Sequence, residues 1–330
     1  MREFDYRRAQ DVPGALALLD DAPDARYLAG GTNLVDLMKS GVERPARLVD
    51  VRELPLDRVE TTPDGGLRVG ATVTNSDLAA HPDVRARYPV LTQAVLAGAS
   101  GQLRNMATVG GNLLQRTRCA YFADTTKPCN KRAPGSGCPA LSGEHRNHAI
   151  LGASDNCVAV HPSDMAVALT ALDAVVHYET AEGQGASPLG EFYLPVGDTP
   201  HRETALPAGA LITGVSLPPV PVAVHSRYRK VRDRASYAFA TGSVAAALDV
   251  RDGIVHDARL AFGAVASRPW RARAAEQVLI GAPATPDTYQ AAADAELAAA
   301  RPLPHNAHKV PLMRALTVAV LSELAEEATR

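Results

Sequence analysis

The stretch YLAGGTNL, residues 27–34, places two adjacent glycines between an apolar strand and the start of a helix. Consecutive backbone N–H groups in such a turn can form an anion-binding nest, and the helix N-terminus that follows adds a partial positive charge. Glycine also allows a ligand to approach the backbone where a side chain would block it. The stretch is neither GxGxxG nor GxxxxGK[ST], so the Rossmann and P-loop signatures are absent. Read alone, it fits an ordinary tight turn equally well.

A second glycine turn lies in RNMATVGGNLL, residues 104–114. It places Gly110 and Gly111 beside the hydroxyl of Thr108 and the amide of Asn112. Two such turns in one half of the chain suit an extended ligand with polar groups along its length, such as a dinucleotide. Asp164, in HPSD, adds an acceptor for ribose or ring donors, although an acid in a first helical turn also complements the helix dipole.

Composition narrows the class of protein. A chain of 330 residues predicts two or three domains. The formal net charge of −2 gives no electrostatic reason to expect nucleic acid or an anionic membrane as a partner. No apolar run approaches the roughly 20 residues of a membrane span, so we expect no membrane insertion. The N-terminal MREFDYRRAQ lacks the apolar core and cleavage site of a signal peptide, so alone the chain should stay in the cytoplasm.

The pattern along the chain changes twice. Its first part predicts short alternating elements: a strand at 4–9, a helix from Pro13 to Leu19, a strand, turn and helix over 25–41, a strand at 46–51, a hairpin around 63–66 and helices over 74–98. Residues 99–160 show little periodicity. Ser163 then caps a helix whose Met165, Leu169 and Leu172 share one apolar face, and a strand at 174–178 follows. Beyond the proline-bearing residues 219–224, longer antiparallel strands and helices follow. The last helix carries an apolar core stripe of Leu312, Leu316, Val320 and Leu324.

All four cysteines lie in the aperiodic segment, with the spacing C-x9-C-x8-C-x18-C: Cys119, Cys129, Cys138 and Cys157. This spacing matches neither zinc fingers nor compact ferredoxin runs. Four thiolates suit one tetrahedral metal or a [4Fe–4S] cluster, while Lys131 and Arg132 would offset negative charge. The pattern favours iron–sulfur over zinc and leaves zinc and inert thiols as alternatives; disulfides are disfavoured in a reducing cytosol. His145 and His148 lie in the same segment, and either could replace one cysteine as a ligand.

An ordered set of motifs spans nearly the whole chain: YLAGGTNL, GATVT, RNMATVGGN, HPSD, ALITGVSLP and YRKVRDRASYAFA. This set resembles the FAD-binding medium subunit of molybdenum hydroxylases, the xanthine dehydrogenase family. The resemblance implies an α+β fold in which a vanillyl-alcohol-oxidase (PCMH)-type FAD-binding domain of two lobes occupies residues 1–220. It also implies a CO-dehydrogenase-flavoprotein-like C-terminal α+β domain over residues 221–330.

The resemblance further implies which residues bind FAD. The first turn would hold the pyrophosphate with Arg26, Tyr27, Leu28, Ala29, Gly30, Gly31, Thr32, Asn33 and Leu34. The second would add Thr108, Gly110, Gly111 and Asn112. Asp164 would reach the ribityl or adenosine portion and Ile212 would lie against the isoalloxazine ring. Arg229 or Lys230 would sit near the polar edge of that ring, where a cation stabilises anionic reduced flavin.

Most members of this family pass directly from the GGN turn to the PxSD helix, whereas this chain inserts a segment at about 113–160. The segment QRTRCAYF…PCNKRAPGSGC…C is similar to the one in the flavin subunit of bacterial periplasmic aldehyde oxidoreductases, which binds a [4Fe–4S] cluster. The resemblance makes all four cysteines ligands of that cluster. The flavin subunit of 4-hydroxybenzoyl-CoA reductase, which also carries a cluster insertion, is the nearest competitor.

The implied function is electron transfer within a larger enzyme, because this chain has no molybdenum site, no [2Fe–2S] pattern and no catalytic residues of its own. A large molybdopterin-binding subunit would oxidise aldehydes to carboxylic acids. A small [2Fe–2S] subunit would pass electrons to the FAD, and an external acceptor would receive them. Export to the periplasm with a signal-bearing partner is implied, with the cytoplasm as the alternative. Xanthine dehydrogenase, a freestanding FAD oxidoreductase and a flavin-free zinc scaffold remain as other functions.

Overall fold

Three separate β-sheets organise the chain, and the computed structural model describes residues 1–328 of it. The N-terminal sheet is parallel, with the strand order β1-β3-β2. Its strands and their helices are β1 (Asp5–Arg8), α1 (Val12–Asp20), β2 (Ala25–Leu28), α2 (Leu34–Lys39) and β3 (Arg47–Asp50). Asp11 begins α1 as predicted, because its carboxylate accepts a hydrogen bond from the N–H of Gly14 at 2.7 Å.

The second sheet is antiparallel and has the order β4-β5-β8-β6-β7. Its strands are β4 (Val59–Thr61), β5 (Leu67–Gly70), β6 (Val175–Thr180), β7 (Gly183–Pro188) and β8 (Leu211–Leu217). Associated with it are the helices α3 (Asn75–Ala80), α4 (Pro82–Arg87), α5 (Pro89–Ala97), α6 (Gly101–Arg104), α7 (Val109–Leu113), α9 (Asp164–Ala171) and α10 (Leu189–Phe192). The predicted hairpin is confirmed as β4 and β5, whereas β7, which is polar and glycine-bearing, was not predicted.

Helix α9 is more deeply buried than its sequence pattern predicts. Ser163 caps it as expected, since its hydroxyl accepts from the N–H of Ala166 at 3.0 Å. All eight of its residues are buried, although the pattern indicated a single apolar face. The helix contacts α5 and α7 as well as the strands β10 (Gly242–Arg251) and β11 (Ile254–Gly263) of the third sheet, so every side meets protein. A helix buried on all sides is largely apolar, and the polar residues of α9 are Asp164 and Thr170.

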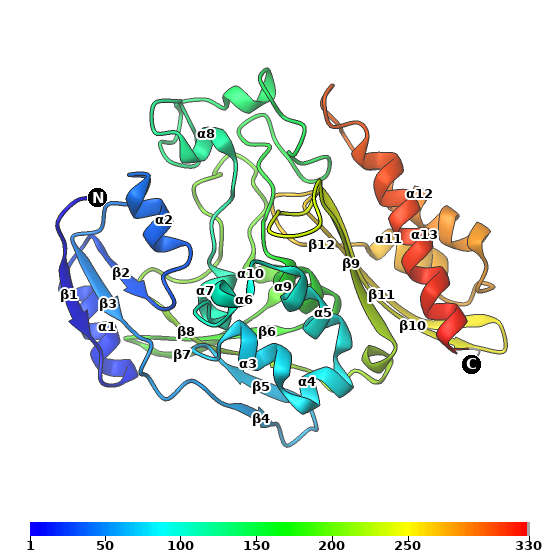
Figure 1. The fold of residues 1–330 in the computed structure, drawn as a ribbon, viewed down its shortest axis with the longest axis horizontal. Coiled ribbons are helices and arrows are strands. Elements are labelled where there is room, and N and C mark those ends of the chain that lie inside the picture. Colours follow the sequence, from blue (N-terminus) through cyan, green and yellow to red (C-terminus); the bar gives the residue numbers. More distant parts are fainter. Residues whose placement is uncertain (329–330) are drawn as a thin grey trace.

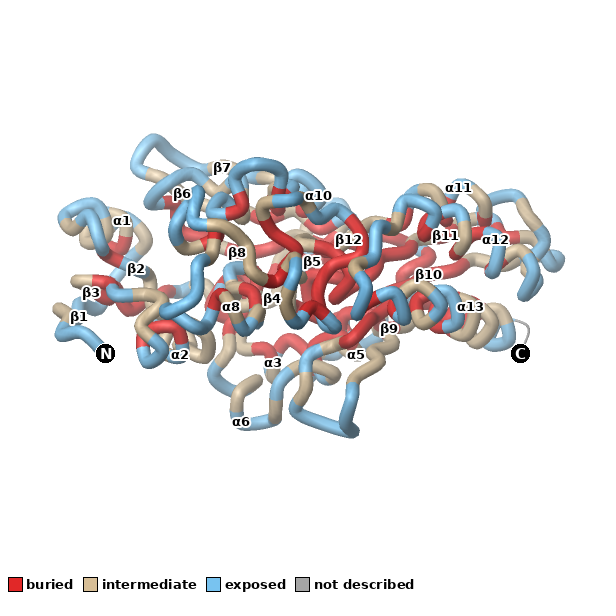
Figure 2. Tube along the Cα trace, turned by 90° about the horizontal axis from the view of Figure 1, so that it is seen from above, coloured by how far each residue is buried: buried red, intermediate tan, exposed pale blue. Residues whose placement is uncertain are grey.

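The third sheet has the order β12-β11-β10-β9, and its two faces contribute to two different hydrophobic cores. Its elements are β9 (Ser226–Val231), β10 (Gly242–Arg251), β11 (Ile254–Gly263), β12 (Trp270–Arg271), α11 (Arg273–Leu279), α12 (Pro286–Leu297) and α13 (Lys309–Ala328). Alternate residues of β10 point to opposite faces. Ala245 and Ala247 belong to the same core as α9, whereas Val244 and Leu248 belong to the core under the C-terminal helices. Figure 2 accordingly shows buried residues concentrated where β10 and β11 lie.

The apolar stripe of α13 packs into this second core. Leu316, Val320 and Leu324 are buried as predicted, and Leu312 is half-buried. The short 3-10 helix η2 (Pro221–Val224) lies where the sequence changes pattern, between β8 and β9.

The cysteine segment, residues 113–160, lies above the second and third sheets in the view of Figure 1. It contains only α8 (Ala120–Ala123) and the 3-10 helix η1 (Pro139–Leu141). The N–H groups of Ile150 and Leu151 both donate to Val265 O, at 2.8 and 2.9 Å, and the N–H of Arg301 donates to Ile150 O at 2.7 Å. The segment is therefore fastened to the C-terminal region, although it has little secondary structure of its own.

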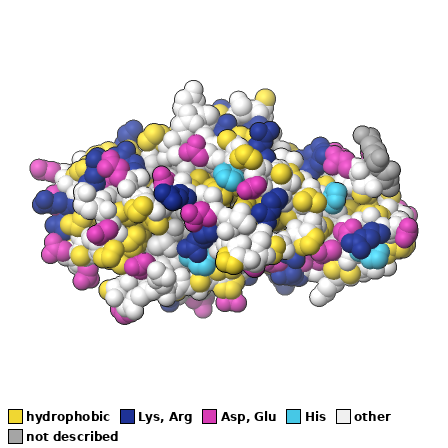
Figure 3. Space-filling model, turned by 90° about the horizontal axis from the view of Figure 1, so that it is seen from below, with side chains coloured by type: hydrophobic (Ala, Val, Ile, Leu, Met, Phe, Trp, Pro, Cys, Tyr) yellow, Lys and Arg dark blue, Asp and Glu magenta, His cyan; other side chains and the backbone are white. Residues whose placement is uncertain are grey.

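The surface carries charges of both signs. On the face shown in Figure 3, Lys and Arg side chains are interspersed with Asp and Glu. Within residues 1–328, no helix combines the length and the apolar character that a bilayer crossing requires.

Lys309, at the start of α13, is fully buried, and its ammonium donates to Ala264 O at 2.7 Å. Burial, and then the nearby Arg146, lowers the pKa of Lys309 from 10.5 to about 7. Between these two pH values the unfolded chain binds more protons than the folded one. The free energy of unfolding should therefore rise with pH, with a contribution from Lys309 of up to about 1.4 kcal/mol per pH unit.

We predict that Lys309→Met makes the free energy of unfolding less dependent on pH. Urea unfolding of both proteins at about pH 7.5 and about pH 9.5 measures the difference. The wild-type protein should gain more stability at the higher pH than the variant does. Equal gains would show that Lys309 keeps an ordinary pKa in the folded protein.

Candidate functional site

A cavity of about 670 Å³ lies between the two glycine turns, the start of α9 and strand β9. Its volume falls within the range of roughly 300–1,000 Å³ that is usual for small-molecule sites. Another hollow, of about 820 Å³, lies against β5 and β6 and includes neither glycine turn. The smaller cavity is therefore the candidate site.

The first glycine turn presents free backbone donors to this cavity. Gly31 has a φ of +71°, a conformation that favours glycine, and α2 begins directly after the turn. In residues 1–328, the N–H groups of Gly31, Thr32 and Asn33 donate to no other backbone or side-chain atom. Asn33 does not cap α2, because its side-chain oxygen accepts from the N–H of Arg116 at 2.8 Å instead. The turn therefore presents three backbone N–H groups to the cavity, as an anion-binding nest would require.

Gly30 makes the two turns fit together. A Cβ atom built on Gly30 would lie 1.8 Å from the carbonyl oxygen of Met106, in the chain just before the second turn. No side chain fits this gap, so the requirement at Gly30 is close backbone packing rather than an unusual dihedral angle.

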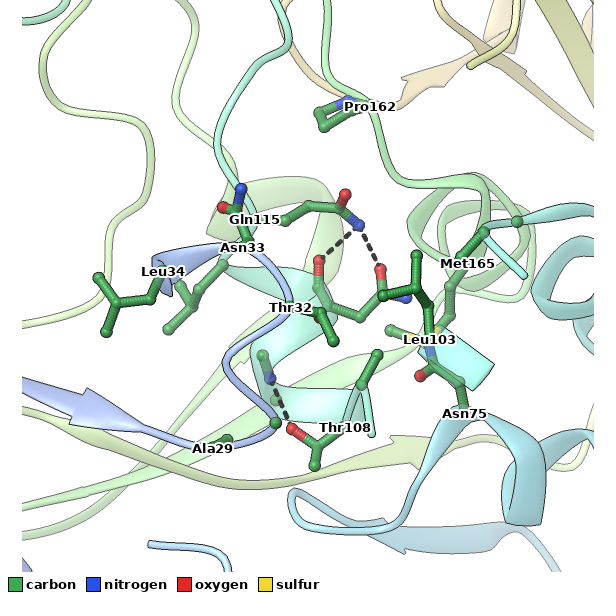
Figure 4. A pocket seen from close by; sticks show the side chains of 18 of the residues that line it. Ala29, Thr32, Asn33, Leu34, Asn75, Leu103, Thr108, Gln115, Pro162 and Met165 are labelled. Carbon is green, nitrogen blue, oxygen red and sulfur yellow. Dashed lines mark hydrogen bonds between the residues drawn. The ribbon is translucent and has the colours of Figure 1, made fainter. Parts of the chain in front are cut away.

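The second turn contributes side chains to the wall of the cavity rather than free backbone N–H donors. Its N–H groups are occupied: Gly110 donates to Ala71 O at 2.9 Å, and Gly111 donates to the hydroxyl of Thr108 at 3.2 Å. Thr108 is the N-cap of α7, and the side-chain oxygen of Asn112 accepts from Gln115 at 2.7 Å (Figure 4). The sequence suggested a second donor loop, but the hydroxyl of Thr108 and the N–H groups serve the turn itself.

Asp164 and Lys230 form a buried ion pair in the wall of the cavity. The ammonium of Lys230 donates to Asp164 Oδ2 at 2.8 Å, and the side chains are only 8% and 4% exposed, respectively. The hydroxyl of Tyr228 donates to Asp164 Oδ1 at 2.5 Å. Burial and the Asp164 charge hold the pKa of Tyr228 well above its usual value, so its phenol remains a donor.

The structure gathers most of the predicted site residues around this cavity. The lining includes Arg26, Tyr27, Ala29, Gly30, Gly31, Thr32, Asn33, Leu34, Thr108, Gly110, Gly111, Asn112, Asp164, Ile212 and Lys230. Leu28 and Arg229 are not part of it. Because successive residues of a strand point to opposite faces, Arg229 turns away from Lys230 and pairs with Glu323 of α13 at 2.7 Å. Of the two cations offered by the sequence, the structure therefore brings Lys230 to the site and leaves Arg229 outside.

Sequence reasoning missed several residues that line the cavity. Asn75 is 4% exposed, and its side-chain oxygen has no hydrogen-bond partner among the described residues, as expected where a ligand supplies a donor. Tyr237 and Phe239 come from the chain after β9, and Phe239 lies under the guanidinium of Arg118 at 4.9 Å. Only the position of Tyr237 and Phe239 within YRKVRDRASYAFA could have indicated them.

The four cysteines converge on one small hollow of about 10 Å³, lined by Cys119, Cys129, Cys138 and Cys157. Burial raises the pKa of Cys119 to about 11 and that of Cys157 above its usual value, so both are thiols at neutral pH. Within residues 1–328, no three His, Cys, Asp or Glu side chains are already placed to hold a metal ion. The donor set is present, but binding a metal would require release of protons and adjustment of the sulfur positions.

A chain of ion pairs links the cysteine segment to the first glycine turn. Arg116, whose N–H binds Asn33, pairs through its guanidinium with Glu43 at 2.9 Å and with Glu203 at 2.7 Å. Glu203 also accepts from Lys131, a buried residue between Cys129 and Cys138, at 2.7 Å. The segment and the cavity are therefore parts of one connected structure.

The two histidines of the segment differ in what they contact. His145 has both ring nitrogens occupied: Nδ1 lies 3.1 Å from Ala140 O, and Nε2 accepts from the N–H of His305 at 3.1 Å. In contrast, Nε2 of His148 lies 3.2 Å from Cys119 Sγ. His145 is thus engaged in fastening the segment, and His148 lies beside a cysteine.

We predict that Gly30→Ala destabilises the protein by about 2 kcal/mol or more, because its methyl group overlaps the backbone at Met106. Gly101→Ala is the matched control, since a Cβ there meets no atom within 4 Å. The control should change the stability by less than about 1 kcal/mol. Denaturant unfolding without added ligand measures both changes. Similar values for the two variants would mean that the turns do not pack as described.

Comparisons with known proteins agree with this geometry. Residues 2–220 match the family described as the FAD-binding domain in molybdopterin dehydrogenase, and residues 226–326 match the C-terminal domain of the CO dehydrogenase flavoprotein.

Two relatives and one solved structure show the extent of the similarity. The chain is 52% identical to the aldehyde oxidoreductase FAD-binding subunit PaoB of Escherichia coli, over 99% of this chain and 100% of that protein. It is 26% identical to the putative xanthine dehydrogenase FAD-binding subunit XdhB of the same organism, over 98% and 96%. A chain of quinoline 2-oxidoreductase from Pseudomonas putida 86 superimposes with a TM-score of 0.77, at 25% identity and over 100% and 99%. This chain therefore belongs to the family of FAD-binding subunits of molybdopterin dehydrogenases.

Proposed function

We propose that this chain is the FAD- and [4Fe–4S]-binding electron-transfer subunit of a molybdenum-dependent aldehyde oxidoreductase. The observation that carries the proposal is the 52% identity to the aldehyde oxidoreductase subunit of E. coli, which extends over both chains without a missing part. The xanthine dehydrogenase subunit matches over nearly the same length at 26%. Aldehyde oxidation is therefore favoured over the xanthine alternative, and membership of an FAD-binding family disfavours a flavin-free scaffold.

The cavity suits FAD in size and in chemistry. The free N–H groups of Gly31, Thr32 and Asn33 would hold the pyrophosphate, beside the positive end of α2. The unpaired oxygen of Asn75 would accept from a ligand N–H or O–H group, and Ile212 would offer an apolar wall. Lys230 would place its charge near the flavin, where Asp164 and Tyr228 hold the side chain in position. When bound, FAD supplies the exchange between one- and two-electron transfer.

The four cysteines would hold the cluster. They line one hollow, and their neighbour Lys131 is a buried cation that offsets the charge of thiolate ligands. His145 does not replace a cysteine in this proposal, because both of its ring nitrogens already have partners. The support for iron–sulfur over zinc is the donor set of four thiols together with the similarity to the aldehyde oxidoreductase subunit.

The rest of the enzyme would supply the substrate chemistry. We propose a large molybdopterin-binding subunit that oxidises the aldehyde and a small [2Fe–2S] subunit that delivers electrons to this chain, with an external acceptor receiving them. A freestanding FAD oxidoreductase is the alternative, and copurification of the subunits distinguishes the two. We also propose that the complex is exported to the periplasm with a signal-bearing partner, which fractionation of cells tests directly.

We predict that Lys230→Met weakens FAD binding by about tenfold or more, because it removes a charged donor from the cavity wall. The matched control is Arg229→Met, its neighbour on β9, which loses only a partly exposed pair with Glu323. The control should keep its flavin. Flavin content and FAD affinity are measured for both variants after purification.

Removal of Lys230 leaves Asp164 buried without its cation and can itself destabilise the fold. A second variant, Gly111→Trp, therefore tests the same cavity by filling it from the glycine turn. It should lose flavin while it keeps its iron. Normal flavin content in both Lys230→Met and Gly111→Trp would contradict the assignment of the cavity.

We predict about four iron and four sulfide per copy of this chain, beyond those of the small subunit. The measurement is chemical analysis of the purified complex together with its ultraviolet–visible spectrum. Cys138→Ser should lower the cluster content, whereas Ser142→Ala, a change in the same segment outside the hollow, should not. Zinc in place of iron, or flavin with no extra iron, would contradict the cluster.

A further inference from the structure

The cysteine sulfurs differ in their hydrogen bonding. Cys119 lies directly before α8, and the N–H of Phe122 donates to its carbonyl oxygen at 3.1 Å rather than to its sulfur. Nε2 of His148 lies 3.2 Å from the same sulfur. Cys157 Sγ accepts only from the N–H of Ala159, at 3.5 Å. In residues 1–328, His148 is the one side chain with a hydrogen bond to a cysteine sulfur among those identified.

The backbone of His148 is fixed on both sides, and its side chain is buried. The residue is 8% exposed, its N–H donates to His145 O at 3.0 Å, and its carbonyl accepts from the side chain of Asn306 at 3.2 Å. Both backbone groups are therefore occupied, one within the segment and the other by the C-terminal region.

The chemistry of the contact identifies the donor. Nε2 of His148 lies 3.2 Å from the sulfur of Cys119 in this structure. A metal-bound cysteine would be a thiolate, which can only accept, so Nε2 would have to carry the hydrogen if the contact is kept when a cluster binds. Nδ1 of His148 is buried and has no hydrogen-bond partner in the described chain. A proton on Nδ1 would leave a buried donor unsatisfied, whereas a bare Nδ1 leaves only an acceptor. Both considerations place the hydrogen on Nε2.

We propose that His148 is a positioning residue that donates from Nε2 to the thiolate of Cys119 and raises the reduction potential of the bound cluster. The inference rests on the proposed function, since it requires a cluster at the four cysteines. A hydrogen bond to a ligand sulfur withdraws electron density and stabilises the reduced, more negative cluster. It also excludes His148 as an iron ligand, because Nε2 would have to lose its hydrogen to bind iron.

The test compares His148→Phe and His148→Gln with the wild-type complex. Iron and sulfide are quantified first, and the midpoint potential is then measured by a redox titration monitored by the paramagnetic signal of the reduced cluster. His148→Phe should keep the full iron content and titrate at a more negative potential. His148→Gln, whose amide can still donate, should lie between His148→Phe and the wild type. Tyr121→Phe is the control: its ring lies 6.4 Å from that of His148, and its hydroxyl binds the N–H of Glu144 rather than a sulfur.

A spectroscopic measurement reports the contact itself. With ¹⁵N-labelled histidine, pulsed electron paramagnetic resonance should detect a weak nitrogen coupling to the reduced cluster that disappears in His148→Phe. An unchanged potential together with an unchanged coupling would overturn the proposal. Loss of one iron in His148→Phe would overturn it too, because His148 would then be a ligand. Absence of iron from the wild-type complex would instead refute the proposed cluster, which separates the two failures.

Discussion

The contact between Gly30 and the carbonyl of Met106 is the constraint on which the cavity depends. The first glycine turn follows β2 of the N-terminal sheet, whereas the second lies at α7, which packs against β5 and β8 of the second sheet. The turns can meet only because no side chain stands between them. Once they meet, the first turn has its N–H groups free and the second has its N–H groups occupied. The two turns therefore look alike in the sequence but differ in structure, since one presents free N–H groups to the cavity and the other uses its N–H groups within its own packing.

The far side of the cavity depends on a buried charge pair. Asp164 begins α9 in the region that matches the FAD-binding domain, and Lys230 lies on β9 in the region that matches the flavoprotein C-terminal domain. Two charges this deeply buried lose much hydration, so the pair is tolerated only where further hydrogen bonds satisfy it. Tyr228 and the carbonyl of Ala97 supply such bonds. The cavity is thus closed by a contact that neither region can make alone.

The sequence predicted helices and strands well where neighbouring residues determine them. It predicted less well the features that depend on packing between distant parts of the chain. Asp11 and Ser163 begin helices as predicted, and the long strands after residue 225 are antiparallel as expected. The burial of α9 on all sides depends on a sheet that forms some 80 residues later, so its periodicity could not reveal it. Likewise, only the alternation of β9 separates Lys230 from Arg229, and only tertiary packing leaves Asn75 without a partner.

The cysteine segment shows how an insertion becomes part of a site without adding a sheet or a long helix. Near its N-terminal end it binds the first glycine turn, through Arg116 and Asn33, and nearer its C-terminal end it binds the connection between β11 and β12, through Ile150 and Val265. A segment with so little regular secondary structure depends for its rigidity on local turns and on cross-links to other parts of the chain. The ion pairs of Arg116 with Glu43 and Glu203, and of Lys131 with Glu203, are such cross-links. They tie the residues around the cysteines to the helix and loops beside the first glycine turn, so the two sites share one set of contacts.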